Sequence, residues 1–158
     1  MEARIEPVVT ERGFRALHEL LVEYERSLPS DLRHGEEPRY EDVRQTYQSP
    51  GGAFLATFDG AYAGCVGVRM LDPKTAILQR LYVRAAHRGK GAARALCRAA
   101  ITLARGSACE RIVLDTDATQ LRAAAALYRS LGFTECAPYW PVDYKCATFM
   151  ELRLTEPA

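Results

Sequence analysis

A two-residue turn signal between two apolar stretches restricts the fold of this chain more than any other feature. Asp59-Gly60 separates residues 53–58 from residues 61–71, and both stretches are rich in residues that favour strands. An Asp-Gly pair in this setting is a strong signal for a tight hairpin. After a further turn at Asp72-Pro73, residues 75–83 predict a third strand. The middle of the chain is therefore expected to form an antiparallel meander.

Side chains along this third strand are expected to alternate between the two faces of the sheet. Strict alternation predicts one face made of Ile77, Gln79, Leu81 and Val83, and an opposite face made of Leu78, Arg80 and Tyr82.

The remaining segments alternate between helical and strand periods. They predict a strand at 4–9, helices at 11–28 and 40–47, a helix from 91 to 106, a strand at 111–115, a helix at 121–131, and strands at 133–137 and 147–154. This order predicts a mixed α/β (α+β) fold built on one sheet, with residues 1–158 as a single domain.

The charge balance restricts the partners of the chain. Its formal net charge is +1, from 21 Lys and Arg against 20 Asp and Glu. Without a strong net charge, binding to nucleic acid or to an anionic membrane through bulk electrostatics is not expected. No stretch reaches the length of a membrane span, and the first residues lack the basic and apolar regions of a signal peptide. We therefore expect no nucleic-acid and no membrane partner.

The cysteines predict neither a disulfide framework nor a zinc site. They number five, they form no C-x-x-C pair, and no histidine is close enough to complete a zinc pattern. We expect no metal, and reduced, mostly packed thiols in the cytoplasm.

A basic, glycine-containing loop leads from the third strand of the meander into the next helix. It consists of Arg88-Gly89-Lys90-Gly91-Ala92-Ala93, and Arg94 follows. Glycines allow the backbone to approach a ligand closely, and a helix that starts at Gly91 leaves amide N–H groups without partners. These donors, the helix dipole and the basic side chains suit a pyrophosphate. A solvated basic turn is the other interpretation of the loop taken alone.

Two common phosphate-binding motifs do not fit this loop. Lys90 is not followed by Ser or Thr, as a Walker A loop requires. Arg94 stands where the dinucleotide fingerprint has a small residue. A nucleotide-binding protein is therefore disfavoured.

Two blocks of the sequence together resemble a known family. Arg88, Gly91 and Ala93 fill the fixed positions of Q/R-x-x-G-x-G/A, the acetyl-CoA-binding motif of the GCN5-related N-acetyltransferase (GNAT) superfamily. Residues 124–133 resemble the second motif of that family, A-x-x-L-Y-x-x-x-G-F. Both blocks occur in the family's order and at its usual separation. The resemblance, over about residues 4–154, implies the GNAT acyl-CoA N-acyltransferase fold, a central and mostly antiparallel sheet with splayed strands, flanked by helices.

The resemblance also implies where acetyl-CoA, the co-substrate, binds. Leu81, Tyr82 and Val83 match the strand whose backbone lies beside the pantetheine arm. The pyrophosphate site is matched by Arg88, Gly89, Lys90, Gly91, Ala92 and Ala93, with Arg94 just behind. Tyr128 matches the tyrosine near the cofactor sulfur, and its hydroxyl is expected to protonate the departing thiolate. A core tyrosine on an amphipathic helix is the other interpretation of Tyr128.

The activity that the resemblance implies is direct transfer of an acetyl group to a primary amine of a small molecule or peptide, without an acyl-enzyme. A backbone N–H around Leu81 is expected to stabilise the oxyanion. Cys97 lies on the apolar face of its helix and is expected to pack rather than react. The alternative function is a catalytically weak acyl-CoA-binding module with a regulatory role. A homodimer is compatible with either function, since dimers are common in the family.

Two departures from the family pattern concern the chemistry. Residues 75–80 hold no carboxylate, where many members have a glutamate that serves as base. Water, or an acid elsewhere such as Glu36, Glu37 or Asp143, is then the candidate proton acceptor. Leu121 stands where many members have an asparagine that contacts the cofactor arm.

The resemblance places the acceptor between residues 24–44 and residues 138–146. The first segment carries acids that suit a cationic amine, and an ordinary solvated surface is the other interpretation; the acids are Glu25, Asp31, Glu36, Glu37, Glu41 and Asp42. Tyr139, Trp140 and Tyr144 are candidates for one wall of the pocket. His34 is a weaker candidate for a functional role.

Overall fold

The computed structural model describes residues 2–154, so residue 1 and residues 155–158 of the predicted domain lie outside the described residues. Its helices are α1 (Glu11–Ser27), α2 (Tyr40–Thr46), α3 (Ala92–Gly106) and α4 (Arg122–Ser130), with the 3-10 turns η1 (Ser30–Leu32) and η2 (Ala85–His87). Its strands are β1 (Arg4–Pro7), β2 (Gly52–Phe58), β3 (Ala61–Asp72), β4 (Thr75–Val83), β5 (Arg111–Asp117), β6 (Thr134–Glu135) and β7 (Ala147–Arg153).

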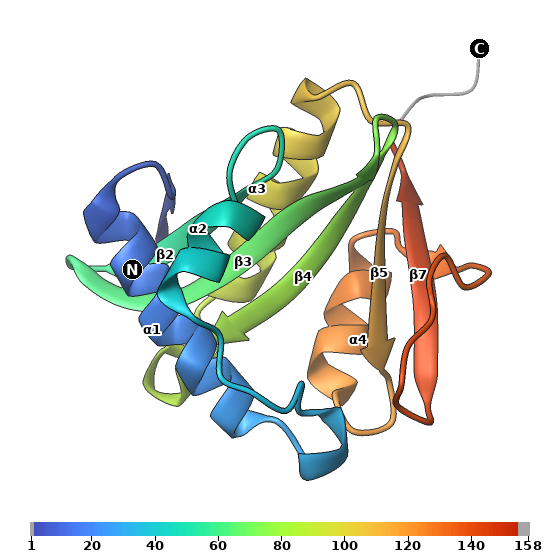
Figure 1. Cartoon of the computed structure of the whole chain (residues 1–158), viewed down its shortest axis with the longest axis horizontal. Helices are drawn as coiled ribbons and strands as arrows, with labels where there is room; N and C mark the ends of the chain where they lie inside the picture. Colours follow the sequence, from blue (N-terminus) through green and yellow to red (C-terminus); the bar gives the residue numbers. More distant parts are fainter. Residues whose placement is uncertain (1, 155–158) are drawn as a thin grey trace.

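All seven strands belong to one sheet, in the order β1-β2-β3-β4-β5-β7-β6. Neighbouring strands are antiparallel except β4 and β5, which are parallel and are connected through α3. One core lies under α1 and α2, and the other lies on the opposite face under α3 and α4 (Figure 1). The predicted mixed α/β fold on a mostly antiparallel sheet is therefore confirmed.

The hairpin predicted at Asp59-Gly60 is present between β2 and β3. Phe58 pairs with Ala61, so only these two residues form the turn. Both have positive φ, 48° for Asp59 and 81° for Gly60. Two left-handed residues define the type I′ turn, whose twist matches that of the flanking strands.

Two predicted strands end elsewhere in the structure. β5 continues two residues beyond the predicted 111–115, to Asp117, because it pairs with β7 along its whole length. β6 is shorter than the predicted 133–137, with one further backbone hydrogen bond from Cys136 to the carbonyl of Phe149. Two residues later Pro138 has no N–H to continue the ladder.

Helix α1 carries one apolar stripe that includes a carboxylate. Thr10 caps the helix, since its hydroxyl accepts a hydrogen bond from the N–H of Gly13 at 3.1 Å. Leu17 and Leu21 are buried on the stripe, and Glu25 follows at the same helical spacing. Glu25 is only 4% exposed, so it does not belong to the solvated acidic surface considered above.

The faces predicted for β4 are wrong, because the strand contains a bulge. Cys65 pairs with Tyr82 and Gly67 pairs with Gln79, so two residues of β4, Arg80 and Leu81, lie opposite the single residue between them on β3. Arg80 has a φ of 60°, and left-handed backbone at a non-glycine residue costs about 1–2 kcal/mol.

The bulge shifts the alternation of side chains by one residue. Leu78, Leu81 and Val83 all lie in the core on the α3 side, whereas Tyr82 packs on the α1 side. Gln79 also faces that side, where its amide donates to the hydroxyl of Tyr47 at 2.6 Å. A bulge adds one residue without breaking the strand. Two residues on either side of it that strict alternation places on opposite faces therefore lie on the same face.

The parallel ladder between β4 and β5 is short. The two strands pair only at Thr75 with Arg111, Ala76 with Ile112, and Ile77 with Val113. Beyond these residues they diverge (Figure 1), while β4 continues to pair with β3 and β5 with β7. The predicted splay is therefore confirmed, and within residues 2–154 it leaves the β5-facing edge of β4 after Ile77 without a strand partner.

Gly67 gives a test of packing beneath α2. A Cβ built on Gly67 would overlap ring carbons of Tyr47, and Gln79 holds the hydroxyl of that ring in place. We expect Gly67→Ala to lower the free energy of unfolding by about 1–3 kcal/mol, because overpacking displaces neighbours. Urea denaturation measures it. Gly106→Ala is the control, since a Cβ there meets nothing within 4 Å; equal losses in the two variants would contradict the packing argument.

None of the helices within residues 2–154 is both long enough and apolar enough to cross a membrane.

Candidate active site

The basic loop passes through two left-handed glycines into the amino terminus of α3. Gly89 has a φ of 78° and Gly91 a φ of 85°. A Cβ at either position would meet nothing within 4 Å, so the backbone conformation, not crowding, favours glycine there. Gly91 is the N-cap residue, and no side chain of the described residues caps the helix. The first N–H groups of α3 are thus available to an anion, which the helix dipole also favours.

The basic side chains of the loop connect it to the elements around it. Arg88 Nε donates to the carbonyl of Val83 at 2.9 Å, which ties the loop to the end of β4. Lys90 Nζ lies 5.4 Å from the centre of the Phe58 ring. Arg94 Nη2 donates to Ser130 Oγ at 3.0 Å and so joins α3 to α4. Positive charge therefore surrounds the helix terminus, and part of it is held in place by these contacts.

The free edge of β4 leads directly into this loop. Leu81 and Val83 pack into the core on the α3 side. Tyr82 packs edge-on against Tyr24, with ring centres 6.0 Å apart, and its hydroxyl lies 3.4 Å from a carboxylate oxygen of Glu23. The side chains of these three strand residues have packing roles, so a ligand beside the strand would contact backbone groups.

Tyr128 lies on α4 and is buried, with 6% of its surface exposed. Its ring packs 5.9 Å from that of Phe133. Burial raises the pKa of Tyr128 well above its usual value, and the neighbouring Cys97, Tyr24 and Asp115 raise it further. No hydrogen bond between its hydroxyl and another group is recorded within residues 2–154. A phenol that keeps its proton and has a free hydroxyl can donate a hydrogen bond to a ligand.

The loop between β6 and β7 brings three aromatic side chains onto one carboxylate of β5. Tyr139 donates to Asp115 Oδ1 at 2.9 Å, Trp140 Nε1 to the same oxygen at 3.2 Å, and Tyr144 to Oδ2 at 2.7 Å. Burial, and then Asp115 itself, raises the pKa of Tyr139 and of Tyr144. The aromatic residues predicted as one wall therefore gather in one place. The sequence pattern alone does not indicate Asp115 as a site residue, although it is the one acid of the predicted strand 111–115.

A second cluster, around the buried carboxylate of Glu25, joins α1, the loop after it and the bulge of β4. Glu25 Oε2 lies 2.8 Å from His34 Nδ1, and Glu25 Oε1 accepts the backbone N–H of His34 in a short hydrogen bond. Arg80 Nη1 lies 3.0 Å from His34 Nδ1 and 3.7 Å from Glu25 Oε2. The sequence predicts Glu25 only as one of the acids that suit a cationic amine, and it gives Arg80 no role in a site. The apolar spacing of α1 was the available signal for Glu25, and no local pattern marked Arg80.

The acids predicted as candidate bases are not among the members of these clusters in the described part of the chain. Glu36, Glu37 and Asp143 are all exposed, and Glu37 pairs with Arg26 at 2.6 Å. None of the three is recorded in contact with Tyr128 or with the β4 bulge in the described part of the chain.

The cysteines show no features of nucleophiles. All five are unpaired, and Cys65, Cys97 and Cys109 are buried. Burial raises the pKa of Cys97 to about 12, so its thiol stays protonated and unreactive near neutral pH. The described residues also contain no cluster of three or more His, Cys, Asp or Glu arranged to hold a metal ion.

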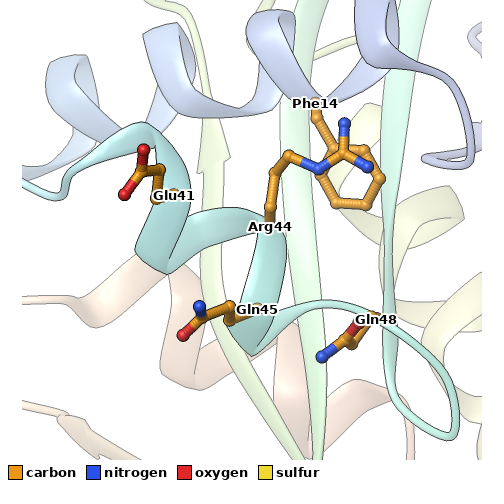
Figure 2. A pocket seen from close by; sticks show the side chains of 5 residues that line it. All are labelled: Phe14, Glu41, Arg44, Gln45 and Gln48. Carbon is orange, nitrogen blue, oxygen red and sulfur yellow. The ribbon is translucent and has the colours of Figure 1, made fainter.

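A surface pocket of about 380 Å³ lies elsewhere, between α1 and α2 (Figure 2). Its lining residues are Phe14, Glu41, Arg44, Gln45 and Gln48. Arg44 covers Phe14, with the guanidinium 4.7 Å from the ring centre. Phe14 precedes Glu25 by 11 residues on α1, which corresponds to about 16 Å along the helix. We therefore treat this pocket as a surface hollow separate from the two clusters.

A family model and individual relatives match the chain. The model described as the Acetyltransferase (GNAT) family matches residues 14–133, which include the basic loop and Tyr128. The uncharacterized N-acetyltransferase YjgM of Escherichia coli is 35% identical over 101 residues, covering 61% of this chain and 60% of YjgM. N-acetyltransferase 8 of Homo sapiens is 34% identical over 99 residues, covering 58% of this chain and 43% of that protein. Both matches span less than two thirds of the relative's own length.

Solved structures share the whole fold. The Salmonella typhimurium protein yncA, whose structure was solved with its cofactor acetyl-CoA, matches with a TM-score of 0.79 at 22% identity, over 100% of this chain and 97% of that chain. The predicted GNAT fold is therefore confirmed.

Proposed function

Because the chain belongs to the acetyltransferase (GNAT) family, we propose that it transfers an acetyl group from acetyl-CoA to a primary amine of a small molecule or a peptide. The relatives named above are N-acetyltransferases, and the structural relative yncA was solved with acetyl-CoA. The acceptor is the part of this proposal that the family leaves open.

The observation that carries the proposal is the free edge of β4 leading into the uncapped start of α3. Acetyl-CoA combines an amide-containing arm with a pyrophosphate. Backbone groups of Leu81, Tyr82 and Val83 would bind the arm, and the amides from Gly89 to Arg94 would bind the pyrophosphate. Both requirements are met by consecutive segments of the chain, in the order in which the two parts of the ligand occur.

Direct attack of the amine on the thioester is the chemistry that fits these residues. A backbone N–H near Leu81, at the bulge, would stabilise the oxyanion, a contribution that reaches about 3 kcal/mol in enzymes. Tyr128 would protonate the departing thiolate. The buried thiol of Cys97 does not favour an acyl-enzyme.

A regulatory module that only binds acyl-CoA remains the second candidate, because β4 lacks a carboxylate. Against it stand two clusters of polar groups, around Glu25 and around Asp115, on the elements that border the diverging strands. A module that only binds its ligand has no need of a free, buried tyrosine hydroxyl beside them.

Release of free thiol from acetyl-CoA tests the two candidates. The purified chain is incubated with acetyl-CoA and, separately, with butylamine, cadaverine, phenethylamine and a peptide with a free amino-terminal alanine. We expect thiol release that depends on at least one amine, with the acetylated product identified by mass spectrometry. Binding of acetyl-CoA in calorimetry without any amine-dependent release would instead support the regulatory module.

A further inference from the structure

The proposed transfer requires a group that removes a proton from the acceptor. An alkyl amine has a pKa of about 10.4, so it arrives as an ammonium ion without a lone pair for attack. The strand β4 offers no carboxylate, and Glu36, Glu37 and Asp143 have no recorded contact with its bulge within residues 2–154. A proton acceptor therefore has to come from another element beside the diverging strands.

His34 lies in the segment that crosses from α1 to α2. Figure 1 shows this segment extending from the end of α1 toward the lower ends of α4 and β5 before it returns to α2. Two contacts fix it there. Gln120 Nε2 donates to Asp31 Oδ2 at 3.0 Å, which ties the segment to the β5–α4 connection, and Arg80 of the β4 bulge contacts His34. The segment that carries His34 is thus tied through Arg80 to β4 and through Asp31 to the connection that follows β5.

The contacts of Nδ1 determine which nitrogen of His34 carries the proton. An ionised carboxylate only accepts hydrogen bonds, so the 2.8 Å contact with Glu25 Oε2 requires a proton on Nδ1. Arg80 Nη1, which can only donate, also lies 3.0 Å from Nδ1, so the two contacts make opposite demands on this nitrogen. The shorter contact with Glu25 favours a proton on Nδ1, and Arg80 is then paired with the same carboxylate at 3.7 Å. With Nδ1 protonated, Nε2 of the neutral ring has a lone pair. The recorded contacts of the His34 ring within residues 2–154 are all at Nδ1, and the side chain is 52% exposed.

We propose that His34 is the catalytic base of the proposed acetyl transfer, and that Glu25 is a positioning residue that holds its Nδ1–H tautomer. This inference rests on the function proposed above. In hydrolases and transferases that use a histidine base, an acid likewise orients the imidazole ring. The charged and titratable groups that face the ring are Glu25 from α1 and Arg80 from β4, with Tyr24 beneath the guanidinium of Arg80.

Both protons that the amine nitrogen loses have an acceptor in this arrangement. One proton passes from the ammonium nitrogen to His34 Nε2, and the freed lone pair attacks the thioester carbonyl carbon. The C–N bond forms and the C–S bond breaks. The second proton leaves the nitrogen and reaches the sulfur through the hydroxyl of Tyr128. His34 returns the first proton to water, so the products are the amide, the free thiol and one proton.

The tautomer of His34 is a test that needs no turnover. Long-range proton–nitrogen correlation spectra of the free protein, with the His34 signals assigned by comparison with His34→Gln, report which ring nitrogen carries the proton. We expect the Nδ1–H form in the neutral ring. An Nε2–H form would overturn the proposal, because the exposed nitrogen would then have no lone pair, and that result would leave the transferase proposal itself unaffected.

Kinetics with the best amine of the panel above is the second test. Glutamine at position 34 can still donate to Glu25 but cannot accept a proton, so we expect His34→Gln to lower kcat/KM about 100-fold and to remove the ascending limb of its pH profile. Affinity for CoA in calorimetry should stay unchanged. His34→Ala should regain activity with added imidazole, a rescue that a structural role does not predict.

Two further variants complete the kinetic test. In Glu25→Gln, an amide that can donate a hydrogen bond to Nδ1 replaces a carboxylate that can only accept one. The Nδ1–H tautomer is then no longer enforced, so we expect kcat to fall as in His34→Gln, with little change in KM. His18→Gln is the matched control, since His18 also anchors the segment, through a 2.8 Å contact with the carbonyl of Pro38, but it lies apart from the cluster. A wild-type pH profile in His34→Gln, or equal losses in His18→Gln and His34→Gln, would overturn the assignment of the base.

Discussion

Tyr128→Phe is expected to lower kcat for acetyl transfer by about 100- to 1000-fold, while KM for acetyl-CoA changes little. No hydrogen bond between the hydroxyl and a protein group is recorded within the described residues, so its removal leaves no such group unsatisfied. The ring keeps its packing against Phe133. The predicted loss therefore concerns proton transfer to the thiolate, for which general acids contribute about 100- to 10,000-fold.

Steady-state thiol release, together with calorimetric titration of CoA, measures this effect. Tyr62→Phe is the matched control, because Tyr62 is a half-buried tyrosine on β3 that packs with the core under α1 and α2. Thermal melts of both variants should lie close to that of the wild type, since neither substitution opens a large cavity. Unchanged turnover in Tyr128→Phe would remove the hydroxyl from the mechanism and leave Tyr128 with a packing role.

Gly91→Asp is expected to weaken CoA binding by about 10- to 100-fold. At the N-cap of α3 the new carboxylate would compete for the amides that are proposed to bind the pyrophosphate, and it would repel that group. A like-charge contact at 4 Å costs about 1–4 kcal/mol near a protein surface. A side chain at a φ of 85° adds strain, although aspartate and asparagine tolerate this region better than most residues.

Gly91→Asn separates the two contributions to this loss. Asparagine has nearly the same size and the same tolerance of left-handed backbone, but it has no charge. Calorimetric titrations of CoA should give a larger loss for aspartate than for asparagine, and the difference should shrink at high salt because ions screen it. Equal affinity of Gly91→Asp and the wild type would contradict the placement of the pyrophosphate at this loop.

The sequence predicted those features that depend on neighbouring residues. The Asp59-Gly60 turn needs only two residues that accept positive φ, and it is present. The cap at Thr10 and the helix start after Gly91 are also encoded within a few residues. The splay of β4 and β5 came from the family resemblance rather than from any local pattern, and it too is present.

The features that were missed depend on contacts distant in sequence. The bulge at Arg80 changes the faces of β4, yet its residue type does not indicate left-handed backbone. Glu25 looked like one more surface acid until the segment after α1 placed His34 and Arg80 around it. Asp115 collects donors from a loop more than 20 residues later in the chain. Such partners are brought together only by the folded sheet.

The three-pair ladder between β4 and β5 has a consequence for the stability of the whole chain. It is the only direct strand pairing between the half of the sheet made of β1 to β4 and the half made of β5 to β7 within residues 2–154. A ligand that hydrogen-bonds to both halves adds its binding energy to the cohesion between them. At a ligand concentration 100 times its dissociation constant, this linkage contributes about 2.7 kcal/mol. The stability of the fold would then follow the supply of acetyl-CoA.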